Sequence, residues 1–128
     1  MQKCPGVALN SYLKKQRASP PVVKSIMRQV FAGIDHMHAS GFAHRDMKIE
    51  NLMFCEKSDK LMIVDFGFSL ECTPETKEKL QCGTPLYQDP ALANFKTYSP
   101  QAVDVWACGV IFYKLVTGNY PFPATEYA

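Results

Sequence analysis

The feature that most constrains the fold is an apolar stretch near the end of the chain, residues 103–116. Its apolar side chains would lie nearly all round a helix rather than on one face, which is typical of a helix that neighbours bury on every side. The stretch is shorter than the roughly 20 residues that a helix needs to cross a bilayer. We therefore expect a buried central helix at about 102–117, with the remaining residues packed around it.

A second helix is expected at about 21–39. Apolar residues recur there at three- and four-residue spacing from Val23 to Met37, which predicts one buried stripe. Ser19 precedes two prolines, so we expect Ser19 as the N-cap and the first proline at the first helical position. Gly41 supplies a left-handed stop just after the helix. A shorter amphipathic helix is expected within residues 5–15.

The pattern changes after Gly41. Two short apolar runs, 52–54 and 61–64, are separated by a polar stretch, which predicts two strands joined in a hairpin. Residues 68–101 show little periodicity and predict a long irregular segment, a kind of segment that is often functional. The expected fold class is mainly α with a small β-hairpin, in one α+β unit.

Charge and cysteine content narrow the classes of function. The net charge is +2 and the charges are interleaved, so no basic stripe suggests a nucleic-acid or membrane partner. The five cysteines form no C-x-x-C pair, which argues against a disulfide framework and a zinc site. With no signal-peptide pattern at the N-terminus, we expect reduced thiols and a cytoplasmic or nuclear protein.

Candidate functional residues lie on both sides of the expected hairpin. His44, Arg45, Asp46, Lys48 and Asn51 precede it, and Asp65, Phe66 and Gly67 follow it. A carboxylate such as Asp46 can accept a hydroxyl proton, and Lys48 offers a charge for a transferring phosphoryl group. The oxygens of Asn51 and Asp65 suit Mg²⁺. A base, a cation and two metal ligands are sufficient for phosphoryl transfer on this side of a nucleotide.

Each residue also has a purely structural interpretation. A single histidine such as His44 is more often a satisfied core residue than a functional one, and Phe66 can be plain core. Residues 65–67 can form a simple turn in which Gly67 supplies a positive φ. The combination of both motifs at this spacing favours the functional interpretation.

The chain resembles the C-terminal lobe of eukaryotic protein kinases over essentially its whole length. Residues 44–51 match the pattern His-Arg-Asp-x-Lys-x-x-Asn, and residues 65–67 match Asp-Phe-Gly. Residues 83–91 look like the end of the activation segment, and Asp104-Val105-Trp106 looks like part of the central helix. Lys48 and Thr84 indicate Ser/Thr specificity, and the spacing looks most similar to the calcium/calmodulin-dependent and AMP-activated-like branch.

The resemblance implies a domain plan and cofactors. It divides residues 1–128 into a hinge (1–6), the helix at about 21–39, a catalytic loop (44–51), an activation segment (65–91) and the buried helix. ATP and Mg²⁺ are implied as cofactors and a protein Ser/Thr side chain as substrate.

The resemblance also implies residue roles. Asp46 would be the catalytic base, Lys48 would contact the γ-phosphate, and Asn51 and Asp65 would hold Mg²⁺. Thr84 would tether Asp46 and Lys48 to the substrate-binding segment. Met53 would lie under the adenine, and Lys48, Asn51 and Asp65 would contact the nucleotide. His44 would stack on Phe66, which is followed by the motif's Gly67. Asp104 would brace the backbone of His44 and Arg45, and Trp106 would lie in the core.

Other family features have no match in these residues. There is no Gly-rich loop, no early-strand Lys and no partner Glu. Ala8, Leu80 and Ala91 stand where the family places a ribose ligand, a phosphothreonine and a Glu. Lys114 stands where basic-directed members often have Glu, so we expect no strong preference for Arg upstream of the phosphoacceptor.

These departures leave three interpretations open. The first is a kinase lobe truncated at both ends, very weak or inactive alone, with an exposed apolar patch on its central helix. The second is a pseudokinase-like binding or regulatory module with a complementing or regulatory protein as partner. The third is an incomplete gene model without activity.

Overall fold

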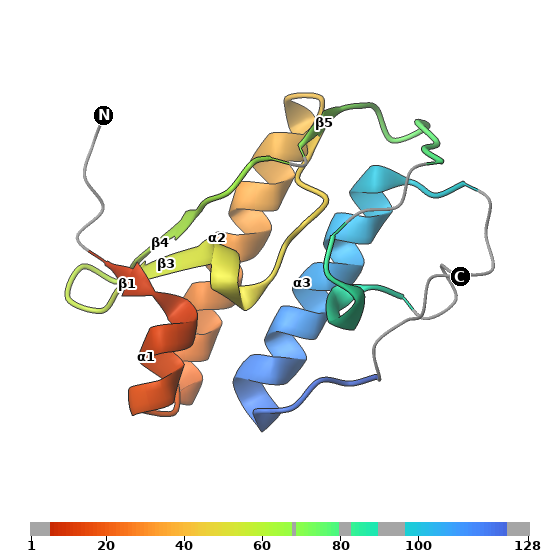
Figure 1. Ribbon diagram of the computed structural model, residues 1–128. Helices are drawn as coiled ribbons and strands as arrows, with labels where there is room; N and C mark the ends of the chain where they lie inside the picture. Colours follow the sequence, from red (N-terminus) through yellow and green to blue (C-terminus); the bar gives the residue numbers. More distant parts are fainter. Residues whose placement is uncertain (1–5, 68, 80–82, 90–96, 123–128) are drawn as a thin grey trace.

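The computed structural model describes residues 6–67, 69–79, 83–89 and 97–122. Two long helices, α2 (Pro20–Ala39) and α3 (Pro100–Thr117), lie side by side (Figure 1). A short helix, α1 (Leu9–Lys15), packs at one end beside the main sheet. Most of the expected hinge and several positions of the expected activation segment, including Leu80 and Ala91, lie outside the described residues.

The strands form two small antiparallel sheets. The main sheet has the order β1-β3-β4, with β1 at Val7–Ala8, β3 at Leu52–Cys55 and β4 at Lys60–Ile63. The second pairs β2 (Phe42–Ala43) with β5 (Leu70–Glu71). Two 3₁₀ turns, η1 (Ile49–Asn51) and η2 (Pro85–Tyr87), complete the elements.

The structure confirms the expected α+β class and adds strands that we did not expect. The hairpin is present as β3 and β4, but β1 adds a third strand and β2 with β5 adds a second sheet. Strands of two residues are too short to show an alternating pattern, so they could not be predicted from the sequence. One of them, β5, lies inside the segment that we expected to be irregular.

Helix α2 buries the stripe that its spacing predicts, and its far end stops at Gly41, where φ is +87°. Its start is as expected, with Ser19 at the N-cap and Pro20 at the first helical position, although the Ser19 side chain makes no capping hydrogen bond. Pro21 lies at the second helical position and has no N–H, which removes one of the two donors that an N-cap side chain normally serves.

Helix α2 packs closely against the main sheet through a glycine. A Cβ atom on Gly33 would lie 2.6 Å from Cδ1 of Ile63 in β4. No real side chain tolerates that distance without movement of its neighbour. The absence of a side chain at position 33 therefore makes room for the β4 side chain.

Helix α3 begins at Pro100, two residues before the expected start. Ser99 caps it by accepting a hydrogen bond from the Ala102 N–H at 3.3 Å, and Gly118 ends it with φ +81°. The Ser-Pro pair that marks the start of α2 therefore also marks the start of α3.

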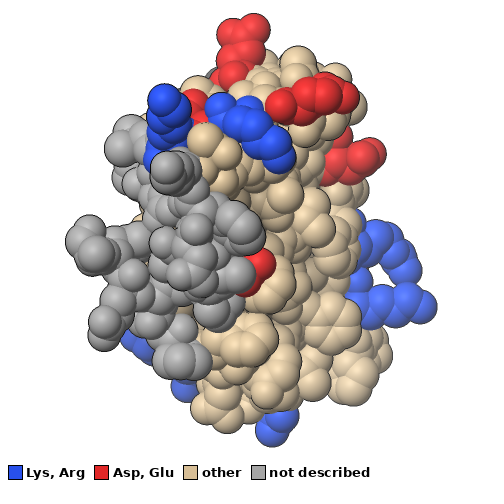
Figure 2. Space-filling model, turned by 90° about the vertical axis from the view of Figure 1, so that its right-hand side faces the viewer, with Lys and Arg blue, Asp and Glu red and all other residues tan. Residues whose placement is uncertain are grey.

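Helix α3 is buried on only part of its circumference. Ile111 and Cys108 are fully buried, whereas Val105, Phe112 and Tyr113 are 56%, 47% and 45% exposed. The apolar patch that we expected to be exposed on this helix is therefore present among the described residues. Figure 2 shows a broad uncharged area on this side of the molecule.

The described cysteines, Cys55, Cys72 and Cys108, are all free thiols. Burial, together with the negative charge of Asp104, raises the pKa of the Cys108 thiol to about 12. Hydrogen bonds from Ser58 lower the pKa of the Cys55 thiol. No helix within the described ranges is long and apolar enough to cross a membrane.

Substitutions on the two sides of α3 should separate buried from exposed positions. Ile111→Ala should lower the free energy of unfolding by about 2–4 kcal/mol, because it leaves a cavity in the core. Val105→Ala on the exposed side should change it by less than about 0.5 kcal/mol. Equilibrium urea unfolding of both variants measures the difference, and equal losses would contradict the described packing of α3.

The thiol pKa values predict a difference in reactivity. At about pH 8, Cys108 should be alkylated by iodoacetamide at least about a hundredfold more slowly than Cys55, because only the thiolate reacts. Mass spectrometry of the two cysteine-containing peptides over time gives both rates. In concentrated urea the two rates should converge, and similar rates in the native protein would count against the burial of Cys108.

Candidate functional site

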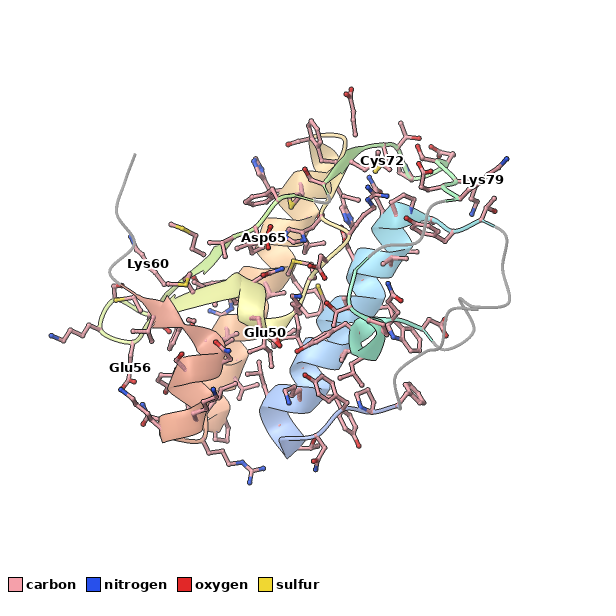
Figure 3. All side chains as sticks on the ribbon, in the orientation of Figure 1. Glu50, Glu56, Lys60, Asp65, Cys72 and Lys79 are labelled. Atoms are coloured by element: carbon pink, nitrogen blue, oxygen red, sulfur yellow. The ribbon has the colours of Figure 1, made fainter. Side chains whose placement is uncertain are left out.

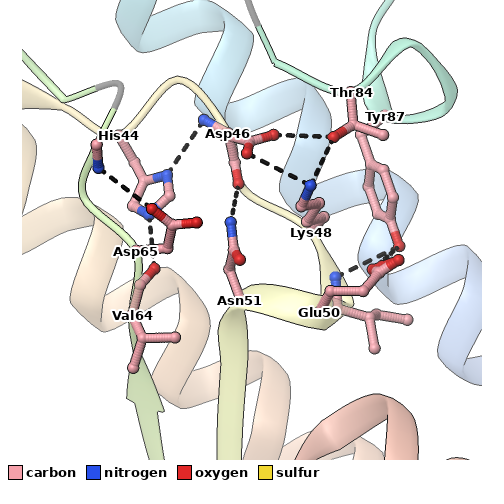
Figure 4. Close-up of polar contacts among 11 residues, drawn as sticks. His44, Asp46, Lys48, Glu50, Asn51, Val64, Asp65, Thr84 and Tyr87 are labelled. Carbon is pink, nitrogen blue, oxygen red and sulfur yellow. Dashed lines mark hydrogen bonds and ion pairs between the residues drawn. The ribbon is translucent and has the colours of Figure 1, made fainter.

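The residues singled out in the sequence come mainly from two stretches of chain that meet above η1. Residues 44–51 cross from β2 into β3, and residues 64–67 follow β4 (Figure 3). A third stretch, 83–87, approaches from the other side and includes η2. The site therefore lies where the ends of the hairpin face a loop that is distant in sequence (Figure 4).

Asp46, Lys48 and Thr84 form a closed hydrogen-bonded cluster. The Thr84 hydroxyl donates to Asp46 Oδ1 at 3.0 Å and accepts from Lys48 Nζ at 2.9 Å. Lys48 Nζ also lies 3.5 Å from Asp46 Oδ2. The Asp46 side chain is only 6% exposed and that of Lys48 is 24% exposed. A carboxylate and an ammonium group are thus held together at the edge of the solvent by one hydroxyl (Figure 4).

Asn51 and Asp65 present oxygen atoms near this cluster. Asn51 Nδ2 donates to the Asp46 backbone carbonyl at 2.8 Å, so the amide oxygen is the atom left to bind another group. The Val64 N–H donates to the Asn51 carbonyl at 2.9 Å, which ties the two chain segments together. Asp65 has φ +60° and its Oδ1 accepts from the Gly67 N–H at 3.4 Å. Amide and carboxylate oxygens of this kind fit Mg²⁺.

His44 connects the segment at Asp46 with the segment at Phe66. Its Nδ1 accepts from the Asp46 N–H at 3.1 Å, so the neutral ring carries its hydrogen on Nε2 and donates it to the Val64 carbonyl at 3.1 Å. The His44 ring lies 5.2 Å from the Phe66 ring. His44 is fully buried, so it is a satisfied core histidine, and its ring contacts the Phe66 ring at a tilt of 58° rather than stacking flat on it.

Asp104 of α3 holds the backbone of this segment. Its carboxylate accepts from the N–H groups of His44 and Arg45, each at 2.8 Å, and lies 2.9 Å from His38 Nε2. Arg45 has φ +71°, a left-handed conformation that costs a non-glycine residue about 1–3 kcal/mol at a functional site. The two charge-assisted hydrogen bonds that the fully buried Asp104 carboxylate accepts offset this cost.

Sequence reasoning missed three residues that shape the site: Gly83, Tyr87 and His38. A Cβ on Gly83 would lie 2.6 Å from the Arg45 carbonyl oxygen, and its φ of +98° also requires glycine. Its place directly before Thr84 could have signalled this contact. His38 lies in the predicted helix and gave no separate signal, because its partner Asp104 is 66 residues away.

Tyr87 joins η2 to η1. Its hydroxyl accepts from the Ile49 N–H and donates to Glu50 Oε1, both at 3.3 Å. Burial raises the pKa of Tyr87, and a hydrogen bond with Tyr120 and the charge of Glu50 act in the same direction. Tyr87 therefore stays protonated and fixes the turn that carries Asn51.

Three other predicted residues lie outside the cluster. Met53 is half-buried in β3, paired with Ala8 of β1 and Met62 of β4. The Arg45 side chain donates to the Tyr98 hydroxyl at 3.1 Å. Trp106 is half-buried and stacks on Phe122, with ring centres 5.9 Å apart, instead of lying fully in the core.

Comparison with known proteins gives one family. The family model described as "Protein kinase domain" matches residues 1–128. Hormonally up-regulated neu tumor-associated kinase homolog B of Xenopus laevis is 35% identical over 133 residues, covering 100% of this chain and 21% of that protein. Serine/threonine-protein kinase ATG1a of Arabidopsis thaliana is 35% identical over 130 residues, covering 99% and 21%.

A third relative is the putative serine/threonine-protein kinase YPL150W of Saccharomyces cerevisiae, 34% identical over 123 residues, covering 95% of this chain and 14% of that protein. The chain thus spans about a fifth or less of the length of these relatives. The matches confirm the resemblance to Ser/Thr protein kinases that the two motifs indicated.

The hydrogen bonds of Asp104 predict a large effect of Asp104→Asn. The variant presents one acceptor and one donor where two backbone N–H groups need acceptors, so it should lose about 2–4 kcal/mol of unfolding free energy. Amide hydrogen exchange at His44 and Arg45 should also become faster. Urea unfolding and exchange measured by NMR test both effects.

Asp35→Asn is the matched control, because Asp35 is an exposed carboxylate on α2. It should change stability by less than about 0.5 kcal/mol. If Asp104→Asn were equally mild, the carboxylate would not be what holds Arg45 in its left-handed conformation.

Proposed function

Because the chain belongs to the protein kinase family, we propose that residues 44–51 and 65–67 form the catalytic-loop side of a Ser/Thr protein kinase site. The reaction is transfer of the γ-phosphate of ATP to a Ser or Thr hydroxyl of a protein substrate. The observation that carries this proposal is the hydrogen-bonded cluster of Asp46, Lys48 and Thr84.

Asp46 is the proposed general base. Thr84 occupies its Oδ1, so Oδ2 is the oxygen that faces an incoming hydroxyl. As the hydroxyl oxygen forms its bond to phosphorus and the bond from phosphorus to the leaving diphosphate breaks, the hydroxyl proton passes to Asp46. The His44 ring, which accepts from the Asp46 N–H, keeps the Asp46 backbone in place.

Lys48 is the proposed cation for the transferring group. Its ammonium lies 3.5 Å from Asp46 Oδ2, which places it beside the point where the new bond would form. Negative charge on the phosphoryl oxygens is stabilised by a cation that is already oriented when the reaction begins. Thr84 holds Lys48 there and links it to the segment that would contact the protein substrate.

Asn51 and Asp65 are the proposed residues for Mg²⁺, and Met53 would lie on the adenine side. Mg²⁺, when bound, neutralises phosphate charge and orients the phosphates for in-line transfer. The bond from Asn51 Nδ2 to the Asp46 carbonyl leaves the amide oxygen as the atom for the metal, and the Gly67 N–H donates to the Asp65 carboxylate. Both ligands are thus oriented by groups in the chain itself.

The 128 residues alone should be a poor catalyst. They contain neither a Gly-rich loop nor a strand Lys with its partner Glu, groups that each stabilise the transition state by several kcal/mol. We propose that activity requires an N-terminal lobe that supplies these groups.

The test is phosphate transfer by this chain joined to such a lobe. With radiolabelled ATP and Mg²⁺, a peptide with Ser or Thr should be labelled and a matched Tyr peptide should not. Asp46→Asn should lower the rate by about 10²–10⁴-fold, because the base is lost. Asp35→Asn, which changes an exposed carboxylate on α2, should leave the rate unchanged.

Equal rates for Asp46→Asn and the unsubstituted chain would rule out Asp46 as the base. No transfer by any form, together with tight binding of a protein partner, would instead support a regulatory module. Calorimetry with Mg-ATP separates these outcomes, because a regulatory module without a nucleotide site gives no heat of binding.

A further inference from the structure

A cavity of about 670 Å³ lies beside the proposed catalytic cluster. It is lined by the end of α1, by Ile49 and Glu50 of η1, and by the end of α3 with the turn that follows it. Figure 1 shows the ends of α1 and α3 at the same edge of the molecule, with η1 above them. Glu50 projects from η1 towards this region in Figure 3.

The charges around this cavity are mostly positive. Four of its lining residues are cations, Lys14, Lys15, Arg17 and Lys114, and one is a carboxylate, Glu50. Lys14 and Lys15 lie in the last turn of α1 and Lys114 in the last turn of α3. The carboxylate of Glu50 already accepts from the Tyr87 hydroxyl. An incoming group therefore meets an excess of positive charge.

Two of the cations are held in place by the chain. Arg17 donates from Nη2 to the Val116 carbonyl, which ties the end of α1 to the end of α3. Lys114 Nζ lies 4.0 Å from the centre of the Tyr120 ring. These contacts reduce the conformational entropy that the two side chains lose when they bind an anion.

The cavity is connected to the catalytic cluster through covalent and hydrogen-bonded neighbours. Ile49, which lines it, directly follows Lys48 in the chain. The Ile49 N–H donates to Tyr87, which lies in η2 next to Thr84, and Tyr87 packs edge-on against Tyr120 at 5.4 Å. A substrate segment with its hydroxyl at Asp46 would therefore place residues a few positions away at this cavity.

We propose that the cavity binds acidic residues that flank the phosphoacceptor Ser or Thr of the protein substrate. This inference rests on the function proposed above and specifies its substrate class. Glu and Asp side chains of the substrate would pair with the cations at the ends of α1 and α3. Arg or Lys at the same substrate positions would be repelled by like charge.

The test is peptide binding to the full 128-residue chain, measured by fluorescence anisotropy. Three labelled peptides share a central Ser flanked on both sides by Glu, by Gln or by Arg. The Glu peptide should bind at least about tenfold more tightly than the Arg peptide, and the difference should shrink as ionic strength rises. Equal binding of all three peptides, or tighter binding of the Arg peptide, would overturn the proposal.

Lysine variants locate the binding surface. Lys15→Gln and Lys114→Gln should each weaken binding of the Glu peptide by about two- to fivefold. Lys60→Gln is the matched control, because Lys60 is exposed at the start of β4 and does not line the cavity. If Lys60→Gln weakened binding as much as the other two, the attraction would be general and the cavity would not be the site.

Asp46→Asn separates this inference from the proposed catalysis. The variant should keep the preference for the Glu peptide, because Asp46 does not line the cavity. Phosphate transfer without any preference for acidic peptides would refute the docking proposal alone. A preference for acidic peptides without phosphate transfer in the joined protein would refute the catalytic proposal alone.

Discussion

The site depends on one buried carboxylate. Asp104 is fully buried in α3, where an unpaired charge would be strongly destabilising, and its partners are two consecutive backbone N–H groups and His38. These bonds hold Arg45 in a left-handed conformation and so set the direction of the chain at Asp46. The same contact joins α3 to the end of α2. The core helix and the proposed catalytic loop are therefore positioned by a single side chain.

Helix α2 could be predicted because its apolar residues follow the helical period, and the hairpin because two apolar runs flank a polar stretch. The two-residue strands carry no period, and their pairing depends on chain segments brought together by tertiary structure. The apolar character of α3 predicted a helix but not which of its faces are buried, because composition does not show which neighbours cover a helix.

The candidate catalytic and metal-binding residues could be predicted from the sequence, but their geometry could not. Motif spacing singled out Asp46, Lys48 and Asn51, whereas Thr84, whose hydroxyl joins Asp46 to Lys48 from 36 positions after Lys48, was indicated only by the family resemblance. For the close approach of Gly83 to the Arg45 carbonyl, the one available signal was its place directly before Thr84. The basic cavity could not be predicted from the sequence, because its cations come from the ends of α1 and α3, which are nearly a hundred residues apart in the chain.

The contact between Gly33 and Ile63 has a consequence for substitution at position 33. Helix α2 and strand β4 approach so closely that the volume at one position limits the volume at the other. Alanine at position 33 would therefore require the terminal methyl group of Ile63 to rotate away, and a larger residue would push the hairpin from its helix.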